Sequence, residues 1–270
     1  MRQWTVDAFT TELFRGNPAA VVEPFDAWPD EAWMQRLAAE NNLSETAFLL
    51  RTGDPARFGL RWFTPTTEVP LCGHATLATT HALFAEMGLG AERIDFDTLS
   101  GPLQVSRIGD LYEMDFPSSP PRRVDPPPGL IEGLGVTPKE VWVAGYLIAV
   151  LEDEAQVRAV APDYGILNTV TAGAPQLPGN VGVAALAPAG ATHDVVDRFF
   201  APGLGVPEDP VCGSMHCILA PLYAGKLGRD TIRFHQAYPG RGGEVECVVR
   251  GERVLLRGAA RTFLEGRIRV

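Results

Sequence analysis

The chain has 270 residues, a formal net charge of −10 and a sequence pI of about 5.0. Because it is acidic and has no run of Lys or Arg, we do not expect it to bind nucleic acid or an anionic membrane. No apolar stretch reaches the ~18 residues of a membrane-spanning helix, and the N-terminus has no apolar signal region. Four cysteines are too few for a disulfide scaffold. The sequence therefore predicts a globular protein of the cytoplasm.

The first half is predicted to combine short strands with two helices. Residues 1–10 place a polar residue at almost every second position, which is typical of a strand. Pro29 and the acidic residues after it favour the start of a helix over Asp30–Asn41. A second helix follows Cys72 and stops before Gly88, since glycine commonly ends a helix. Further strands are predicted at Ala47–Leu50, Arg93–Phe96, Leu103–Ser106 and Glu113–Phe116.

Residues 117–129 contain six prolines and divide the chain near its middle. Proline fixes φ and has no N–H, so neither a helix nor a central strand is expected to cross this segment. The predicted halves are residues 1–118 and 119–270, with the last strand left free to return to the first half. The second half is predicted to hold helices at Glu154–Ala161 and between Cys212 and Gly228, and strands at Val183–Ala187, Thr231–Phe234, Glu244–Val249 and Arg253–Arg257.

The two halves repeat one another. E-V-P-L-C-G-H at residues 68–74 returns as E-D-P-V-C-G-S at residues 208–214, and each motif is followed by an apolar helical pattern. Upstream, Arg61-Trp-Phe matches Arg198-Phe-Phe, and Gly16-Asn-Pro has a fainter counterpart in Gly179-Asn-Val. A unit of more than a hundred residues is too long for a solenoid repeat. The sequence therefore indicates a duplicated domain.

This duplication predicts an α+β fold of two pseudo-symmetric domains. Both repeated helices are apolar on nearly every face, so each is expected to be buried, with a curled mixed sheet around it. Pseudo-twofold packing of the halves would bring the two helix N-termini to one active site between the domains. Helix N-termini present unpaired N–H groups and partial positive charge, so such a site would bind a small carboxylate.

Several motifs along the chain resemble the PhzF family of phenazine-biosynthesis-type isomerases. They are D-A-F-T at 7–10, R-G-N-P-A-A-V-V at 15–22, A-E-N-N-L-S-E-T-A-F at 39–48, R-W-F-T-P at 61–65, the two Cys-Gly motifs, and Q236 with G-R-G-G at 240–243. The resemblance implies a diaminopimelate-epimerase-like fold, isomerisation without metal or coenzyme, and a homodimer.

By the same resemblance, Glu45 is the catalytic carboxylate, which takes a proton from one carbon of the substrate and returns it at another. The other implied site residues are His74 and Asp209, which would position the substrate or relay a proton, and Gly73, Gly213 and Ser214, which with His74 would bind it. A structural role is the alternative for each: a loop carboxylate or capping partner at Glu45, a buried histidine at His74, a brace before Pro210 at Asp209, and a helix cap at Ser214.

One departure from the family pattern leaves two other functions open. Many members have Thr where this chain has Cys212, and Cys72 stands at the matching place in the first half. Racemases and epimerases of this fold use two such thiols as paired acid and base. A thiol at a helix N-terminus is expected to have a lowered pKa, so Cys72 and Cys212 are a second candidate pair, although free cysteines are often only core residues. A protein that binds small acids without turnover is the third hypothesis.

The sequence predicts no metal site and no nucleotide cofactor. Its five histidines form no H-E-x-x-H motif, and there is no paired C-x-x-C, no Walker loop and no G-x-G-x-x-G that opens a helix after a strand. The expected ligand is a small carboxylate-bearing substrate whose identity the residues do not specify.

Overall fold

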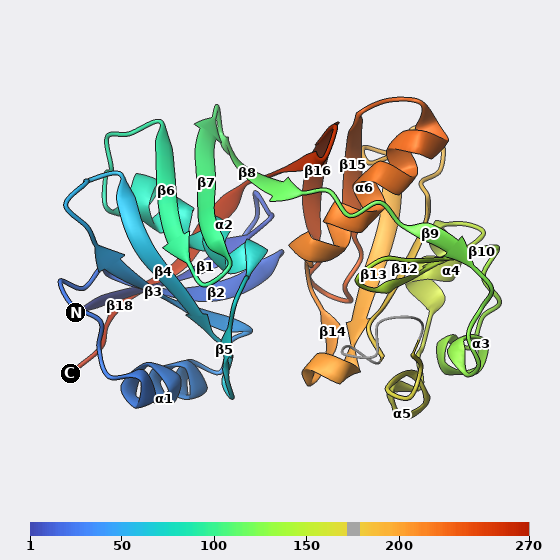
Figure 1. Cartoon of the computed structure of the whole chain (residues 1–270), viewed down its shortest axis with the longest axis horizontal. Coiled ribbons are helices and arrows are strands. Elements are labelled where there is room, and N and C mark those ends of the chain that lie inside the picture. The colour runs from blue at the N-terminus through green and yellow to red at the C-terminus, as the bar shows by residue number, and fades with distance from the viewer. Residues whose placement is uncertain (172–178, 270) are drawn as a thin grey trace. The chain divides into compact units, whose positions relative to one another are not determined.

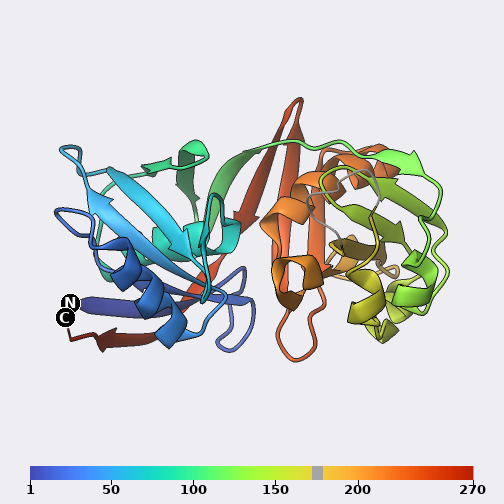
Figure 2. The same cartoon turned by 60° about the horizontal axis from the view of Figure 1, so that its bottom comes forward.

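The computed structural model describes residues 1–171 and 179–269 (Figures 1 and 2). The chain divides into two compact units, the first made of residues 1–115 with the C-terminal residues from 257, and the second of residues 116–256. The last strand of the chain belongs to the first unit, where it pairs with the first strand. Among the described residues, no helix combines the length and hydropathy that crossing a bilayer requires.

The first unit is built on a mixed β-sheet. Its strands are β1 (Arg2–Ala8), β2 (Asn17–Val22), β3 (Glu45–Arg51), β4 (Arg57–Phe63), β5 (Glu68–Val69), β6 (Arg93–Thr98), β7 (Gly101–Ile108), β8 (Leu111–Pro117) and β18 (Ala260–Arg267). Their order is β18-β1-β2-β3-β4-β6-β7-β8, and the short β5 pairs with β4. The pairs β2–β3 and β4–β6 are parallel, and the others in this order are antiparallel.

Two helices cover the two faces of this sheet. Helix α2 (Gly73–His81) contacts β1, β2, β3 and β18 and is buried from His74 to Thr80 (Figure 1). Helix α1 (Glu31–Asn41) packs Met34 and Ala38 on Phe48 of β3. Since alternate residues of a strand point to opposite faces, Glu45 of the same strand points to the α2 side. The sheet therefore carries Glu45 toward the central helix.

The helix predicted to run from Cys72 to Gly88 changes its winding before it ends. After His81 the chain forms a π-helical turn, Ala82–Glu86 (η1), in which the N–H of Met87 bonds to the carbonyl of Ala82 five residues back. Phe84 in this turn stacks on Tyr112 of β8 at 5.9 Å. The sequence prediction of one regular helix was therefore wrong for its last turn.

The second unit has a sheet with the same pattern of pairing. Its strands are β9 (Arg122–Val124), β10 (Glu140–Val143), β11 (Leu147–Val150), β12 (Val181–Leu186), β13 (Val195–Ala201), β14 (Val206–Asp209), β15 (Thr231–Gln236) and β16 (Gly243–Arg250); β17 (Arg253–Gly258) follows along the chain. The order is β9-β10-β11-β12-β13-β15-β16, with β14 on β13. The pairs β11–β12 and β13–β15 are parallel, as β2–β3 and β4–β6 are in the first unit.

Helix α6 (Gly213–Leu227) is the counterpart of α2 and contacts β15 and β16. Short helices α3 (Leu130–Leu134), α4 (Glu154–Ala159) and α5 (Tyr164–Leu167) help to bury the apolar cluster of the second unit. α3 and α5 were not predicted, because four or five residues are too few to show helical periodicity. The predicted helix Glu154–Ala161 is α4, two residues shorter.

The proline-rich segment docks on α6 within the second unit. Pro221 inside α6 has no N–H, which leaves the carbonyl of Cys217, four residues earlier, without its helical partner. The N–H of Ser119 bonds to that carbonyl at 3.0 Å. The segment also holds one short strand, β9, which pairs with β10 and lies at the edge of the sheet. A central strand is thus avoided there, as the prolines predicted.

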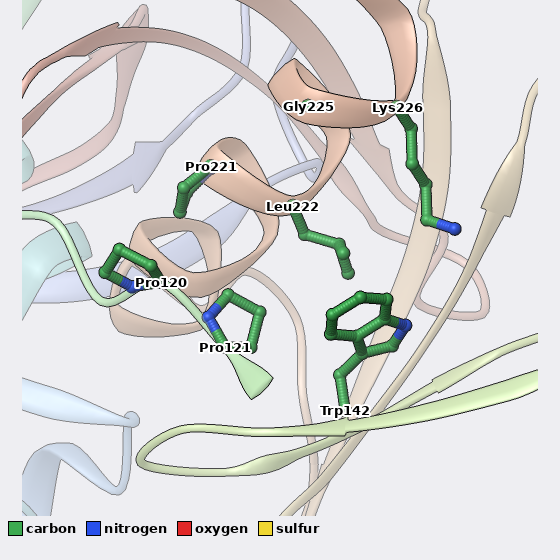
Figure 3. A pocket seen from close by; sticks show the side chains of 7 residues that line it. All are labelled: Pro120, Pro121, Trp142, Pro221, Leu222, Gly225 and Lys226. Atoms are coloured by element: carbon green, nitrogen blue, oxygen red, sulfur yellow. The ribbon is translucent and has the colours of Figure 1, made fainter. Parts of the chain in front are cut away.

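A cavity of about 380 Å³ lies beside this contact (Figure 3). It is lined by Pro120, Pro121, Trp142, Pro221, Leu222, Gly225 and Lys226. Four of these residues, from Pro221 to Lys226, lie on the C-terminal half of α6, and Pro221 is eight positions, roughly 12 Å, from the first residue of that helix. None of the predicted site residues lines this cavity.

Candidate active site

An arginine–glutamate ion pair precedes each Cys-Gly motif. In the first unit, Arg61 binds both carboxylate oxygens of Glu68 at 2.7 Å. In the second unit, Arg198 binds those of Glu208 at 2.7 and 2.9 Å. Each glutamate is the first letter of the repeated heptad and lies on a short strand beside the strand of its arginine. The repeated glutamates therefore fix the strand that leads into each helix N-terminus.

Glu45 and His74 form the closest titratable pair of the first Cys-Gly site. Glu45 opens β3 and His74 is the second residue of α2. The Oε2 atom of Glu45 lies 2.9 Å from Nε2 of His74, and the two side chains are 15% and 6% exposed. Their alignment at this distance is too poor for a hydrogen bond. The carboxylate is thus close to the imidazole and still reaches the surface of its unit.

The other ring nitrogen of His74 has two neighbours. Its Nδ1 atom lies 3.2 Å from Nδ2 of Asn17 and 3.5 Å from Sγ of Cys72. Asn17 is fully buried at the start of β2, and its Oδ1 accepts a hydrogen bond from the hydroxyl of Ser44 at 3.2 Å. Ser44 directly precedes Glu45 in the chain. The imidazole therefore has polar neighbours at both of its nitrogens.

Burial and neighbouring charges set the pKa values of this cluster. Burial raises the pKa of the Cys72 thiol to about 11, with a further contribution from Glu45. For His74, burial disfavours the charged form, but Cys72 and Glu45 outweigh it and raise its pKa well above the usual value. Because Cys72 stays a neutral thiol at physiological pH, we take Glu45 as the charge that matters for His74 there. The expectation that the helix N-terminus lowers the pKa of Cys72 was wrong, since burial dominates.

The raised pKa predicts slow alkylation of Cys72. At pH 8 we expect iodoacetamide to react on the order of tenfold more slowly with Cys72 than with a free cysteine, because the thiolate is the nucleophile. Peptide mass spectrometry of the intact, folded protein measures this rate. Glu45→Gln removes a negative charge that raises the pKa, so the pH at which Cys72 begins to react should fall. An unchanged or higher onset in that variant would contradict this account.

Glu45, Cys72 and His74 also offer three atoms within 4.8 Å of one another that could hold a metal ion. However, Sγ of Cys72 lies near Nδ1 of His74, and the carboxylate of Glu45 lies near Nε2. These two nitrogens point in different directions from the ring. An ion bound to one nitrogen would therefore lie beside only one of the other two candidate ligands, Cys72 or Glu45. The arrangement suits proton transfer through the imidazole better than chelation.

In the second unit, the Cys-Gly motif carries neutral side chains. The Oγ atom of Ser214 lies 3.0 Å from the hydroxyl of Tyr146 and 3.3 Å from Sγ of Cys212. Burial raises the pKa of Tyr146 to about 12, with Cys212 adding to the effect. Burial, with Asp209 adding to it, also raises the pKa of Cys212 well above its usual value. At neutral pH, Ser214, Tyr146 and Cys212 are therefore hydrogen-bonding groups without charge.

The side chain of Gln236 connects Asp209 with the start of α6. Its Nε2 donates to the carbonyl of Asp209 at 2.7 Å, and its Oε1 accepts from the N–H of Cys212 at 2.9 Å. Gln236 is fully buried at the end of β15. It closes the turn that places Gly213 and Ser214 as the first two residues of α6, as Gly73 and His74 are in α2.

The strand registers show which residue of the second unit stands in the place of Glu45. Phe63 pairs with Thr46, and its counterpart Phe200 pairs with Val181. The residue before each partner is Glu45 in the first unit and Asn180 in the second. The sequence-based match of Asn180 with Asn17 was therefore wrong, since the strand registers align Asn180 with Glu45 instead. Asn180 is 3% exposed, and its amide makes no hydrogen bond within the described structure.

Sequence reasoning did not assign site roles to Asn17, Tyr146, Asn180 or Gln236. Asn17 and Gln236 lie in motifs that the sequence analysis singled out, so a signal was present, but their partners are far away in the chain. Tyr146 follows Gly145 in a stretch without any motif. Only the folded arrangement brings its hydroxyl to Ser214.

Comparison with known proteins supports the family and the fold. Residues 6–266 match the family described as phenazine biosynthesis-like protein (PhzC-PhzF). The chain is 44% identical over 262 residues to a protein of Pseudomonas aeruginosa named an uncharacterized isomerase, covering 97% of this chain and 96% of that one. The protein thus belongs to the phenazine biosynthesis-like, or PhzC-PhzF, family, and some of its bacterial relatives are named isomerases. The predicted family is confirmed.

Two solved structures place the fold. A PhzF family protein of Enterococcus faecalis is 39% identical and superimposes with a TM-score of 0.92, covering 100% of this chain and 99% of that one. A probable proline racemase of Agrobacterium radiobacter, 13% identical, has a TM-score of 0.62 over 100% of this chain and 93% of that one. The α+β, diaminopimelate-epimerase-like fold predicted from the sequence is confirmed.

Proposed function

We propose that this protein is a cofactor-independent isomerase that moves a proton between two carbons of a small carboxylate-bearing metabolite. Glu45 is the general acid and base. The observation that carries this proposal is its position 2.9 Å from the buried His74 imidazole, with part of its side chain still exposed. A group that exchanges protons with a substrate must be both held in place and reachable.

His74 assists Glu45 in this proposal. An imidazole with a raised pKa gives the carboxylate a partner that takes or supplies a proton between the two halves of the reaction. The substrate carboxylate binds to N–H groups at a helix N-terminus, those of Gly73 and His74 in α2 and those of Gly213 and Ser214 in α6. That both helices serve one substrate, that Asp209 positions it, and that the protein is a homodimer remain predictions.

The first alternative, an amino-acid racemase with Cys72 and Cys212 as its acid and base, is less well supported. Burial raises the pKa of both thiols, so at neutral pH neither is poised to act as the thiolate base that such a racemase needs. In addition, the place of Glu45 in the second unit holds the neutral Asn180. The observed titratable pair beside a helix N-terminus, Glu45 and His74 in the first unit, therefore supports the carboxylate mechanism better than the thiol mechanism.

Deuterium exchange tests the proposal against both alternatives. The full-length protein is incubated in deuterated water with a panel of small unsaturated acids and amino acids, and label uptake into carbon is followed by NMR. We expect at least one unsaturated acid to gain deuterium at one of two carbons. Uptake only at the α-carbon of an amino acid would support the racemase. Tight binding of an acid without any uptake would support the non-catalytic binding protein.

A further inference from the structure

The side chains of Ser44 and Asn17 connect the start of β3 with the imidazole of His74. The hydroxyl of Ser44 donates to Oδ1 of Asn17 at 3.2 Å. Nδ2 of the same amide lies 3.2 Å from Nδ1 of His74. Asn17 and His74 are 0% and 5% exposed, so water does not readily replace either partner. Whether Nδ1 carries a proton therefore depends on whether this amide presents a donor or an acceptor to it.

An amide group offers a donor on one side and an acceptor on the other. With Nδ2 toward His74, Asn17 donates to an unprotonated Nδ1, and the imidazole carries its proton on Nε2, facing Glu45. If His74 takes up a proton at Nδ1, rotation of the amide by 180° presents Oδ1 as the acceptor. Nδ2 then donates to the hydroxyl of Ser44, which turns to accept. In both states the amide presents to Nδ1 of His74 the group that complements its protonation, a donor in the first and an acceptor in the second.

We propose that Asn17, backed by Ser44, is a positioning residue that sets which nitrogen of His74 carries the proton and adapts when the imidazole gains or loses one. This inference rests on the proposed role of His74 as the partner of Glu45. The charged or titratable groups that face the imidazole are Glu45 at Nε2 and Cys72 at Nδ1. A weakly donating thiol at 3.5 Å competes poorly with an amide N–H at 3.2 Å.

The tautomer of His74 in the protein without substrate tests this inference independently of activity. In protein with ¹⁵N-labelled histidine, we expect His74 in its neutral form to show an unprotonated Nδ1 and a protonated Nε2. Asn17→Asp replaces the donor with a carboxylate that only accepts, so Nδ1 should stay protonated and the pKa of His74 should rise further. Deuterium exchange into substrate should fall roughly tenfold to a hundredfold, the range seen when an orienting partner is removed.

Asn41→Asp is the matched control. Asn41 is a half-buried amide of the same unit that bonds to Gln3 and Thr46 and not to a histidine, so its change should leave the His74 signals unmoved. If Asn17→Asp does not fold, Ser44→Ala provides a milder test. Loss of the hydroxyl removes one donor to Oδ1 and so favours turning that oxygen toward Nδ1, so the population with a protonated Nδ1 should increase.

Three results would overturn the inference. One is a neutral His74 with its proton on Nδ1 in the unmodified protein. The second is a tautomer that Asn17→Asp and Ser44→Ala leave unchanged. The third is a tautomer that changes in Cys72→Ala, which would make the thiol the determining neighbour. None of these depends on isotope exchange, so a failure of the proposed isomerisation is recognised separately.

Discussion

Glu45→Gln is expected to reduce deuterium incorporation into the substrate by about 10²–10⁴-fold, the usual contribution of general acid–base catalysis. Glutamine keeps the shape of the side chain but cannot accept and return a proton. The fold should be retained, because Glu45 is a partly exposed first residue of its strand. The measurement compares exchange rates at saturating substrate for the purified variant and the unmodified protein.

The same substitution also has a spectroscopic consequence. The carboxylate of Glu45 is one of the groups that raise the pKa of His74, so this pKa should fall in Glu45→Gln. Cys72→Ser serves as the control for the thiol mechanism and should keep most of the exchange activity. If Glu45→Gln exchanged normally while Cys72→Ser was inactive, the thiol mechanism would replace the one proposed here.

Glu208→Leu is expected to destabilise the second unit by about 3–5 kcal/mol, the cost of leaving one member of a buried ion pair without its partner. The side chains of Arg198 and Glu208 are only 5% and 8% exposed. The second terminal nitrogen of the guanidinium donates to the carbonyls of Val157, Arg158 and Val160, the last at 2.7 Å. Loss of Glu208 therefore leaves a buried charge that also caps the end of α4.

Glu68→Leu is the matched control in the first unit. Arg61 and Glu68 are about one-fifth exposed, and Arg61 keeps a second carboxylate, Glu31, at 2.9 Å. We therefore expect a loss of about 1 kcal/mol or less, in line with exposed ion pairs. Amide hydrogen exchange followed by mass spectrometry reports on each unit through its own peptides. Faster exchange in Glu208→Leu should appear in the peptides of β12 and β13. Equal losses of stability in both variants would show that burial does not determine how much these ion pairs contribute to stability.

Much of the fold could be predicted because this chain repeats itself. The heptads at 68–74 and 208–214, with their shared arginines upstream, align two units strand by strand, and the structure bears out this alignment in the paired registers. The strand predictions fell within observed strands apart from Ala187 and the ends of the first one, which was predicted over residues 1–10 and covers Arg2–Ala8. Alternation of polar and apolar residues is retained in half-buried sheets and makes such strands recognisable. Short helices and the π-helical turn were missed because they leave no periodic signal.

The site was only partly predictable, for a different reason. Glu45, His74 and Cys72 belong to motifs that are recognisable in the sequence, and the structure brings their side chains together within the first unit. Tyr146 reaches Ser214 from 68 positions away, and Asn17 reaches His74 from 57. Such contacts depend on how the strands are ordered, which no local pattern encodes. The thiol pKa values were misjudged because burial cannot be read from a helix terminus alone.

The asparagine at the place of Glu45 in the second unit has an evolutionary consequence. In the proposed mechanism the first unit supplies the reactive acid, while the second unit has an amide at the matching place and is not constrained by the proton transfer. Relatives that process different compounds are therefore expected to diverge first around Tyr146, Asn180 and Ser214. A library randomised at those three sites should yield altered selectivity without rebuilding the chemistry.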